Sequence, residues 1–383
     1  MFYQRPSGSH PGFTTILLCL VGFLCVQAQQ ATIPPSTNPT RQSIEPSQQS
    51  TPSLKRGERK EEQKEVADEV ITTETDLTNL LFTAVDKNKR LITIIQQQDI
   101  RVLEDGVPQQ IFTFQRETDR PLSLAILVDV SRSQQLILDD EKEAARRFVN
   151  TVLHNPKDEI AVISFSGEAM VEQELTSRVS NVQNAIERIE VVLPPGYIGG
   201  GIVVNNPSAS SSSNDDFRLG TTAIWDAVWA VSEELFINDQ KQRRRAIILI
   251  TDGVDTSSRV KSEEAIKRAI AADAAVYTIG MGDDINFEGV KKSSLRKISE
   301  HTGGRAYFPR NDVELQASFS QIEQELRSQY LVAYAPSNKN RDGSYRKVEI
   351  EVINPELRKL KTKLNYRDGY IAKRTTAAKT ATR

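Results

Sequence analysis

The middle of the chain shows the hydrophobic pattern of strands that alternate with helices. Residues 122–128 (LSLAILV) and 246–250 (AIILI) are almost entirely apolar, which is typical of strands buried on both faces. Residues 139–153 are amphipathic with acidic residues in the first turn, which predicts a helix. Similar patterns predict strands at 160–165, 275–279 and 305–308, and helices at 182–189, 223–235, 262–272, 295–302 and 313–328.

This alternation predicts βαβ units, and therefore an α/β fold with a doubly wound, mainly parallel sheet and helices on both faces. We assign this domain to residues 119–328. Within it, residues 194–219 are rich in Gly, Ser and Asn and predict a long surface loop. The sequence leaves open whether this loop contributes to specificity or is a flexible insertion.

The segments on both sides of the α/β domain have a β pattern instead. Residues 66–118 and 329–371 contain short runs of β-branched and aromatic residues, separated by turns such as Asp105-Gly106 and Asp342-Gly343. We expect the two flanks to pair into one small β-module into which the α/β domain is inserted. Two separate modules are the alternative.

The chain begins with features of export rather than of a folded domain. Residues 13–28 (FTTILLCLVGFLCVQA) form an apolar run shorter than the ~20 residues of a membrane-spanning helix, and Arg5 precedes it. We therefore expect residues 1–28 to be a cleavable signal peptide, with no integral membrane span in the mature chain. This predicts a secreted or periplasmic protein, with an uncleaved N-terminal anchor as the alternative. Residues 29–65, rich in Gln, Ser, Thr and Pro and then in charges, predict a disordered linker, and residues 372–383 a disordered tail.

Composition excludes several kinds of site. The two cysteines, Cys19 and Cys25, both lie in the expected signal peptide, so disulfides, zinc ribbons and thiol nucleophiles are not expected in the mature chain. The chain has three histidines, one of them also in that peptide, which argues against a histidine-rich metal site. The formal net charge of −2 gives no indication of nucleic-acid binding.

Other residues that attract notice are expected to have structural roles. The basic run at 241–245 is interpreted as solvated charge ahead of a core strand. Trp225 and Trp229 lie four residues apart and are expected to form a core stripe on a helix. Asp255 is expected to be a turn residue.

Oxygen-bearing side chains follow the two apolar strands. Asp129, Ser131 and Ser133 come after the first strand and Asp252 after the second, while Thr222 lies between them at a predicted helix start. In an open α/β sheet, ligands bind beyond the carboxyl ends of the strands where the strand order reverses, so these five residues could converge there. Carboxylates and hydroxyls are hard donors, which favour a divalent cation, most of all Mg²⁺, with Mn²⁺ or Ca²⁺ possible.

This arrangement resembles the metal-ion-dependent adhesion site of von Willebrand factor type A domains, which have a Rossmann-like fold. Residues 220–227 (GTTAIWDA) and 248–253 (ILITDG) are similar to that family's helix start and second metal strand. The flanking motifs at 104–109, 326–331 and 341–348 resemble a bacterial secreted subset. The resemblance implies that Ser131, Ser133 and Thr222 ligate the ion directly, and that Asp129 and Asp252 do so directly or through water. It also implies an open position that accepts a carboxylate from a partner protein.

The sequence offers no candidate catalytic residue, because neither a histidine partner for Ser131 nor a further general base is identifiable. We therefore expect a non-enzymatic, adhesion-type protein-binding module that recognises an acidic side chain. The alternative is an envelope scaffold whose metal site captures no partner. Arg132 stands where the family often has glycine; it could weaken cation binding by repulsion or steer an acidic partner.

Overall fold

The structure is a computed structural model that describes residues 77–117, 120–193, 197–198, 202–203, 221–237, 239, 243–281 and 290–374. The expected signal peptide at 1–28, the linker at 29–65, most of the loop at 194–219 and most of the tail at 372–383 lie outside these residues. Among the described residues, no helix combines the length and the apolar character needed to cross a membrane.

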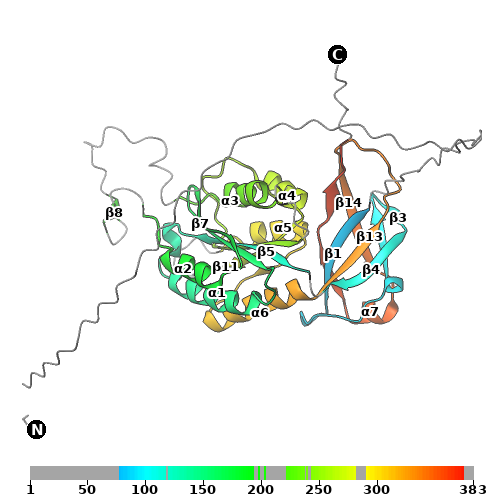
Figure 1. The fold of residues 1–383 in the computed structure, drawn as a ribbon, viewed down its shortest axis with the longest axis horizontal. Helices are drawn as coiled ribbons and strands as arrows, with labels where there is room; N and C mark the ends of the chain where they lie inside the picture. Colours follow the sequence, from blue (N-terminus) through cyan, green and yellow to red (C-terminus); the bar gives the residue numbers. More distant parts are fainter. Residues whose placement is uncertain are drawn as a thin grey trace, which may run out of the picture. The chain divides into compact units, whose positions relative to one another are not determined.

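The α/β domain is built on one six-stranded sheet with strand order β12-β11-β10-β5-β6-β7 (Figure 1). The first five strands in this order are parallel, and β7 returns antiparallel to β6. The expectation of a mainly parallel sheet is confirmed, but β7 was not anticipated, since its residues are half-exposed and carry no continuous apolar run. The strands are β5 (Leu122–Asp129), β6 (Glu159–Phe165), β7 (Ala169–Thr176), β10 (Arg244–Thr251), β11 (Ala274–Gly280) and β12 (Ala306–Tyr307).

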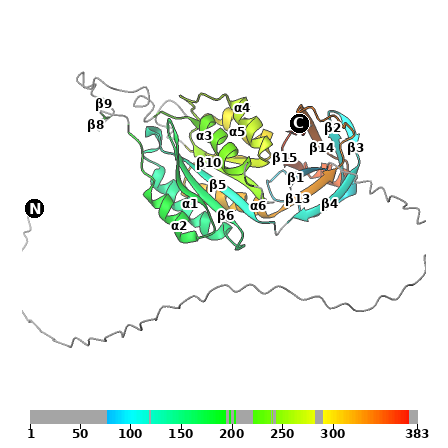
Figure 2. The same cartoon turned by 45° about the horizontal axis from the view of Figure 1, so that its top comes forward.

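Helices cover both faces of this sheet, as expected of a doubly wound fold. Alternate residues of β5 face opposite sides: Leu124 and Ile126 pack in one apolar cluster, and Ala125 and Leu127 in the other. One layer consists of α1 (Leu138–Val152), α2 (Val179–Arg188) and α6 (Asp312–Arg327). The other consists of α3 (Ile224–Ala230), α4 (Ser262–Ala271) and α5 (Lys292–Thr302), as Figures 1 and 2 show from two sides.

The helix expected at 223–235 is not α-helical throughout. It changes after Ala230 into a π-helix, η4 (Val231–Ile237), where the hydroxyl of Ser232 donates to the carbonyl of Val228. Trp225 is buried in this layer and Trp229 is partly buried against the same cluster. Both side chains therefore lie in the core stripe proposed for them.

The two flanks form two four-stranded sheets, each of which combines strands from before and after the α/β domain. Their orders are β15-β1-β13-β4 and β16-β14-β2-β3. One apolar cluster, which includes Phe82, Val102 and Tyr330, contains residues of both sheets. The elements are β1 (Thr78–Val85), η1 (Gln97–Asp99), β2 (Ile100–Glu104), β3 (Val107–Gln109), β4 (Ile111–Glu117), β13 (Gln329–Tyr334), β14 (Tyr345–Val352), α7 (Pro355–Lys359), β15 (Lys363–Tyr366) and β16 (Gly369–Ile371).

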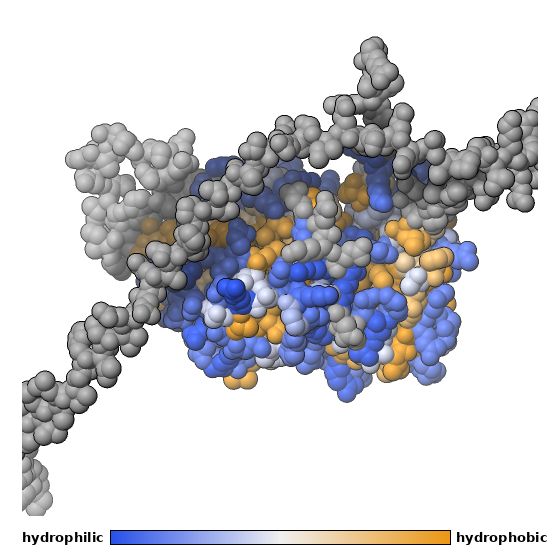
Figure 3. Space-filling view, in the orientation of Figure 1, coloured by the Kyte–Doolittle hydropathy of each residue, from blue (hydrophilic) through white to orange (hydrophobic). Residues whose placement is uncertain are grey.

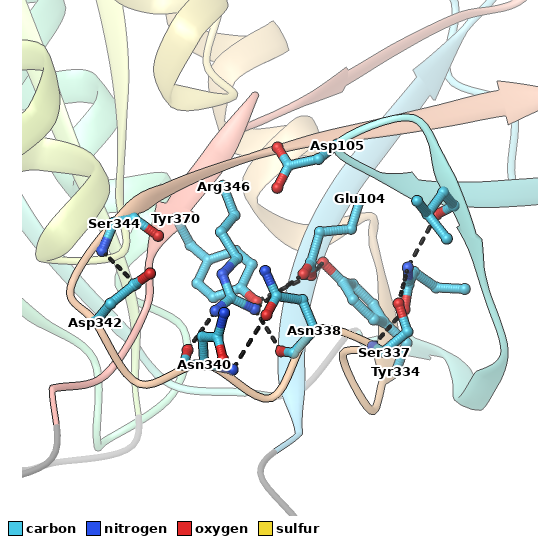
Figure 4. A network of polar contacts seen from close by, with 12 residues as sticks. Glu104, Asp105, Tyr334, Ser337, Asn338, Asn340, Asp342, Ser344, Arg346 and Tyr370 are labelled. Atoms are coloured by element: carbon cyan, nitrogen blue, oxygen red, sulfur yellow. Dashed lines mark hydrogen bonds and ion pairs between the residues drawn. The ribbon is translucent and has the colours of Figure 1, made fainter.

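A buried polar network joins strands of the β-module (Figure 4). The carboxylate of Glu104 accepts hydrogen bonds from the hydroxyls of Tyr334 and Tyr370, each at 2.9 Å, and forms an ion pair with Arg346 at 3.2 Å. The guanidinium of Arg346 also donates to the carbonyl of Asn338 at 2.5 Å. Strands β2, β13, β14 and β16 are therefore linked through one carboxylate, although they come from opposite ends of the chain.

The expectation that the basic run at 241–245 is solvated is wrong for its described part, residues 243–245. Arg244 is buried, and its guanidinium donates to the carbonyls of Arg120 and Leu326. Arg243 forms an ion pair with Glu159 on β6. The physical reason is that β10 begins beside both segments that connect the α/β domain to the β-module, where main-chain carbonyls replace water as partners.

Candidate metal centre

Asp129, at the end of β5, joins the two central strands of the sheet. Its side chain is fully buried. Its Oδ1 accepts a hydrogen bond from the backbone N–H of Ser131 at 2.9 Å, and its Oδ2 accepts one from the hydroxyl of Thr251, the last residue of β10, at 2.6 Å. The carboxylate is thus fixed from both strands and has little freedom to reorient.

The two serines of the motif lie in the turn that follows β5. The hydroxyls of Ser131 and Ser133 are 3.0 Å apart, and the short 3₁₀ helix η2 (Arg132–Gln134) sets this spacing. Ser131 is buried, whereas Arg132 and Ser133 are exposed. The serine pair therefore extends from the buried Asp129 towards the surface.

The remaining two candidates are held together by the segment that follows β10. Asp252 is nearly buried, and its Oδ1 accepts the backbone N–H of Val254 at 2.9 Å. The backbone N–H of Thr222 donates to the hydroxyl of Thr256 at 2.8 Å, and its carbonyl accepts the N–H of Thr256 at 2.8 Å. Thr222 is therefore attached to the same turn that holds Asp252.

Asp255 is part of this turn and stabilises the start of α3. Its Oδ1 accepts the backbone N–H of Ile224 at 2.9 Å and the hydroxyl of Ser258 at 2.5 Å. Free N–H groups at a helix start need such acceptors. Asp255 thus occupies the structural role expected of it, and it orients Thr222 only indirectly.

The electrostatics of the site are those of crowded buried acids. Burial raises the pKa of Asp129 to about 7, against the lowering effect of hydrogen bonds from Thr251 and Ser131, and the charge of Asp252 raises it further. Burial raises the pKa of Glu141 well above its usual range, and the charges of Asp129 and Asp252 add to this effect. Burial and neighbouring negative charge therefore both disfavour the ionised forms of Asp129 and Glu141.

Glu141 is the residue that sequence reasoning missed. It is completely buried in the first turn of α1. A signal was present, because Glu141 lies three and four residues from Leu138 and Ala145, on the apolar stripe of an amphipathic helix. An acid at such a position is rarely buried without a partner.

The donor set fits a hard divalent cation. It consists of carboxylate and hydroxyl oxygens from three separate segments, which are ligands that Mg²⁺ and Ca²⁺ accept. In the described part of the chain, no group of three or more His, Cys, Asp or Glu side chains could hold a metal ion. A cation at this edge would therefore need the hydroxyls of Ser131, Ser133 and Thr222 as well as the two aspartates.

Comparison with known protein families finds matches within the α/β domain that carries this site. Two sequence profiles described as "von Willebrand factor type A domain" match residues 124–254 and 209–322. No curated protein sequence matches the chain.

Several solved structures are similar at low identity. One is a von Willebrand factor type A protein from Catenulispora acidiphila, with 13% identity and a TM-score of 0.42; the match covers 81% of this chain and 77% of that one. Another is BatB from Bacteroides thetaiotaomicron, with 20% identity and a TM-score of 0.39; the match covers 54% of this chain and 100% of that one. A third is proximal thread matrix protein 1 from the mussel byssus, in a structure described as having a zinc-occupied MIDAS motif. It has 19% identity and a TM-score of 0.40, and the match covers 55% of this chain and 48% of that one.

Proposed function

Because this chain contains a von Willebrand factor type A domain, which the two profiles place within residues 124–322, we propose that it is a metal-dependent protein-interaction module. Asp129, Ser131, Ser133, Thr222 and Asp252 would hold the ion. The observation that carries the proposal is the buried carboxylate of Asp129, which a hydrogen bond from Thr251 fixes between the ends of β5 and β10, with the paired hydroxyls of Ser131 and Ser133 directly after it. The charge of Asp252, after β10, acts on the same carboxylate. Mg²⁺ is the ion we propose, because it accepts oxygen ligands and retains open, water-filled positions.

The bound ion would supply one coordination position to a carboxylate of a partner protein. Two features of the described residues support a partner-facing surface here. Arg132 is exposed in the turn between the two serines and adds positive charge. Leu136, in the same loop, is 75% exposed and adds an apolar side chain to this surface. On the face drawn in Figure 3, hydrophilic residues surround several hydrophobic areas.

The decisive experiment measures capture of an acidic partner with and without the ion. Metal-free protein would be immobilised, supplied with Mg²⁺ or EDTA, and exposed to proteins of the envelope of the organism that makes it. We expect capture that EDTA reverses, that Ser131→Ala abolishes, and that soluble acidic peptides inhibit more than their amide counterparts do. Ser180→Ala, exposed on α2, is the matched control and is expected to retain capture.

Capture that persists in EDTA and in the Ser131→Ala variant would contradict this mechanism and would favour a scaffold acting through the β-module.

We also propose that the protein is exported and non-enzymatic, on the pattern of residues 1–28 and the lack of an identifiable general base in the sequence. Fractionation of tagged protein tests export. Metal-dependent turnover of peptide or ester substrates would contradict the non-enzymatic assignment.

A further inference from the structure

Glu141 is an acid in a position where the fold would accept an apolar residue. It lies on the buried stripe of α1 together with Leu138, Ala145 and Phe148, and it is 0% exposed. The neighbouring acids of the same helix, Asp139, Asp140 and Glu143, face solvent. Burial of Glu141 is therefore specific to its side chain and is not a property of an acidic helix start.

Both carboxylate oxygens of Glu141 lack a hydrogen-bond partner among the described residues. The side-chain oxygen of Gln134 is also buried and unpartnered there, and Gln134 closes the η2 turn that carries the two serines. Buried polar atoms are nearly always hydrogen-bonded, and an unpartnered group points to a missing water or ion. These three oxygens therefore need donors that the described residues do not supply.

The position of α1 brings this carboxyl to the edge of the sheet where the metal centre lies. The helix follows the short turn after β5, and β10 pairs in parallel with β5, so α1 begins on the edge of the sheet where both strands end. Besides burial itself, the negative charges of Asp129 and Asp252 are the main causes that raise the pKa of Glu141, so its carboxyl lies within electrostatic range of both. However, no set of three acidic side chains among the described residues could hold an ion directly.

We propose that Glu141 is an outer ligand of the metal centre, whose carboxylate accepts hydrogen bonds from water molecules bound to the cation, with Gln134 as a second acceptor. Water on a divalent cation is a strong donor and would satisfy the unpartnered oxygens. Because Mg²⁺ loses water reluctantly, acceptors placed behind its water molecules favour hydrated Mg²⁺ over Ca²⁺. This inference rests on the proposed metal-binding function.

The test is Mg²⁺ binding to metal-free protein, measured by titration calorimetry, together with thermal melting in EDTA. Loss of an outer partner of a metal ligand weakens affinity by roughly 10- to 100-fold, and we expect this for Glu141→Gln. In EDTA the same substitution is expected to raise the melting temperature, since it removes a buried acid that has no partner. This pair of opposite effects would not arise from a purely structural role.

Glu143→Gln, exposed on the same helix, is the matched control and should change neither quantity. Glu141→Leu is the second variant: it also removes the acceptor, and it should lower Mg²⁺ affinity at least as much as Glu141→Gln. Unchanged Mg²⁺ affinity in both Glu141 variants would overturn the inference while leaving the metal centre in place. Wild-type protein that binds no divalent cation would overturn both the inference and the proposed function.

Discussion

The hydroxyl of Thr251 donates a 2.6 Å hydrogen bond to Oδ2 of Asp129 and so connects the carboxyl ends of β10 and β5. Both residues are fully buried, so water cannot replace this bond. The pair fixes the orientation of the first acid of the site from a strand 122 residues away.

Replacement of Thr251 by valine, which has nearly the same shape, removes that donor and frees the carboxylate of Asp129. We expect Mg²⁺ affinity to fall by roughly 10- to 100-fold, as for other partners of metal ligands, with calorimetric titration as the measurement. Thr278→Val is the control, because Thr278 is equally buried in β11 but its hydroxyl contacts Ser299 instead. Equal affinity losses in the two variants would show a general effect on the sheet.

The stability of metal-free protein should depend on the protonation of Asp129. Its pKa is raised from 3.8 to about 7 in the folded state, so the folded form binds a proton more tightly than the unfolded form. The resulting stabilisation is fully present below about pH 4 and is lost as the pH rises to about 7, by at most about 1.4 kcal/mol per pH unit. Urea unfolding in EDTA between pH 4.5 and 7.5 measures this slope, and Asp129→Asn should flatten it. A steeper slope in the variant would contradict the assignment.

Gly253, directly after Asp252, is required by both its backbone and its surroundings. Its φ is +82°, and a Cβ at this position would lie 2.9 Å from Cγ of Leu295. Gly253→Ala should therefore cost about 1–2 kcal/mol for the left-handed backbone and a further ~1–3 kcal/mol for the clash. Gly106→Ala provides the reference, since Gly106 has a φ of +80° and open space around it. Chemical unfolding of both variants separates the two contributions, and equal losses would exclude the steric one.

The buried ion pair of the β-module should contribute more to the free energy of unfolding than an exposed pair between the same strands. Glu104 and Arg346 are almost completely buried, whereas Arg101 and Glu351, also on β2 and β14, are about half-exposed. Glu104→Gln leaves Arg346 buried without its counter-charge, so we expect a loss of about 3–5 kcal/mol. Glu351→Gln should cost about 0–1 kcal/mol. Thermal or urea unfolding compares them, and similar losses would argue against a structural role of the network in Figure 4.

The central strands could be predicted because their pattern is local. A short run of apolar, partly β-branched residues such as 122–128 is typical of a strand covered on both faces, and β5 and β10 have this environment. The positions of Asp129 and Asp252 at the ends of these strands follow from the same pattern. The antiparallel return of β7 could not be predicted in this way, because a half-exposed edge strand lacks a continuous apolar signal.

Contacts between distant segments were not predictable. The basic run at 243–245 has the composition of a solvated segment, yet Arg244 lies where two connections between the domains expose main-chain carbonyls. Likewise, Glu104 meets Arg346 because β2 pairs with β14, and it meets Tyr334 because the two sheets of the β-module share one core. Local composition carries no information about which carbonyl or carboxylate from a distant segment will lie beside a given side chain in the fold.

The sequence by itself determined the mainly parallel sheet, its helices on both faces and the kinds of oxygen donors at the ends of β5 and β10, because burial periodicity and ligand chemistry are properties of short segments. The tertiary structure alone decided which atoms those donors contact, the link from Thr251 to Asp129, and the burial of Glu141 on α1. The physical reason is that the electrostatic cost of a buried acid depends on the water and charges around it in the fold, and these come from segments far away in the chain.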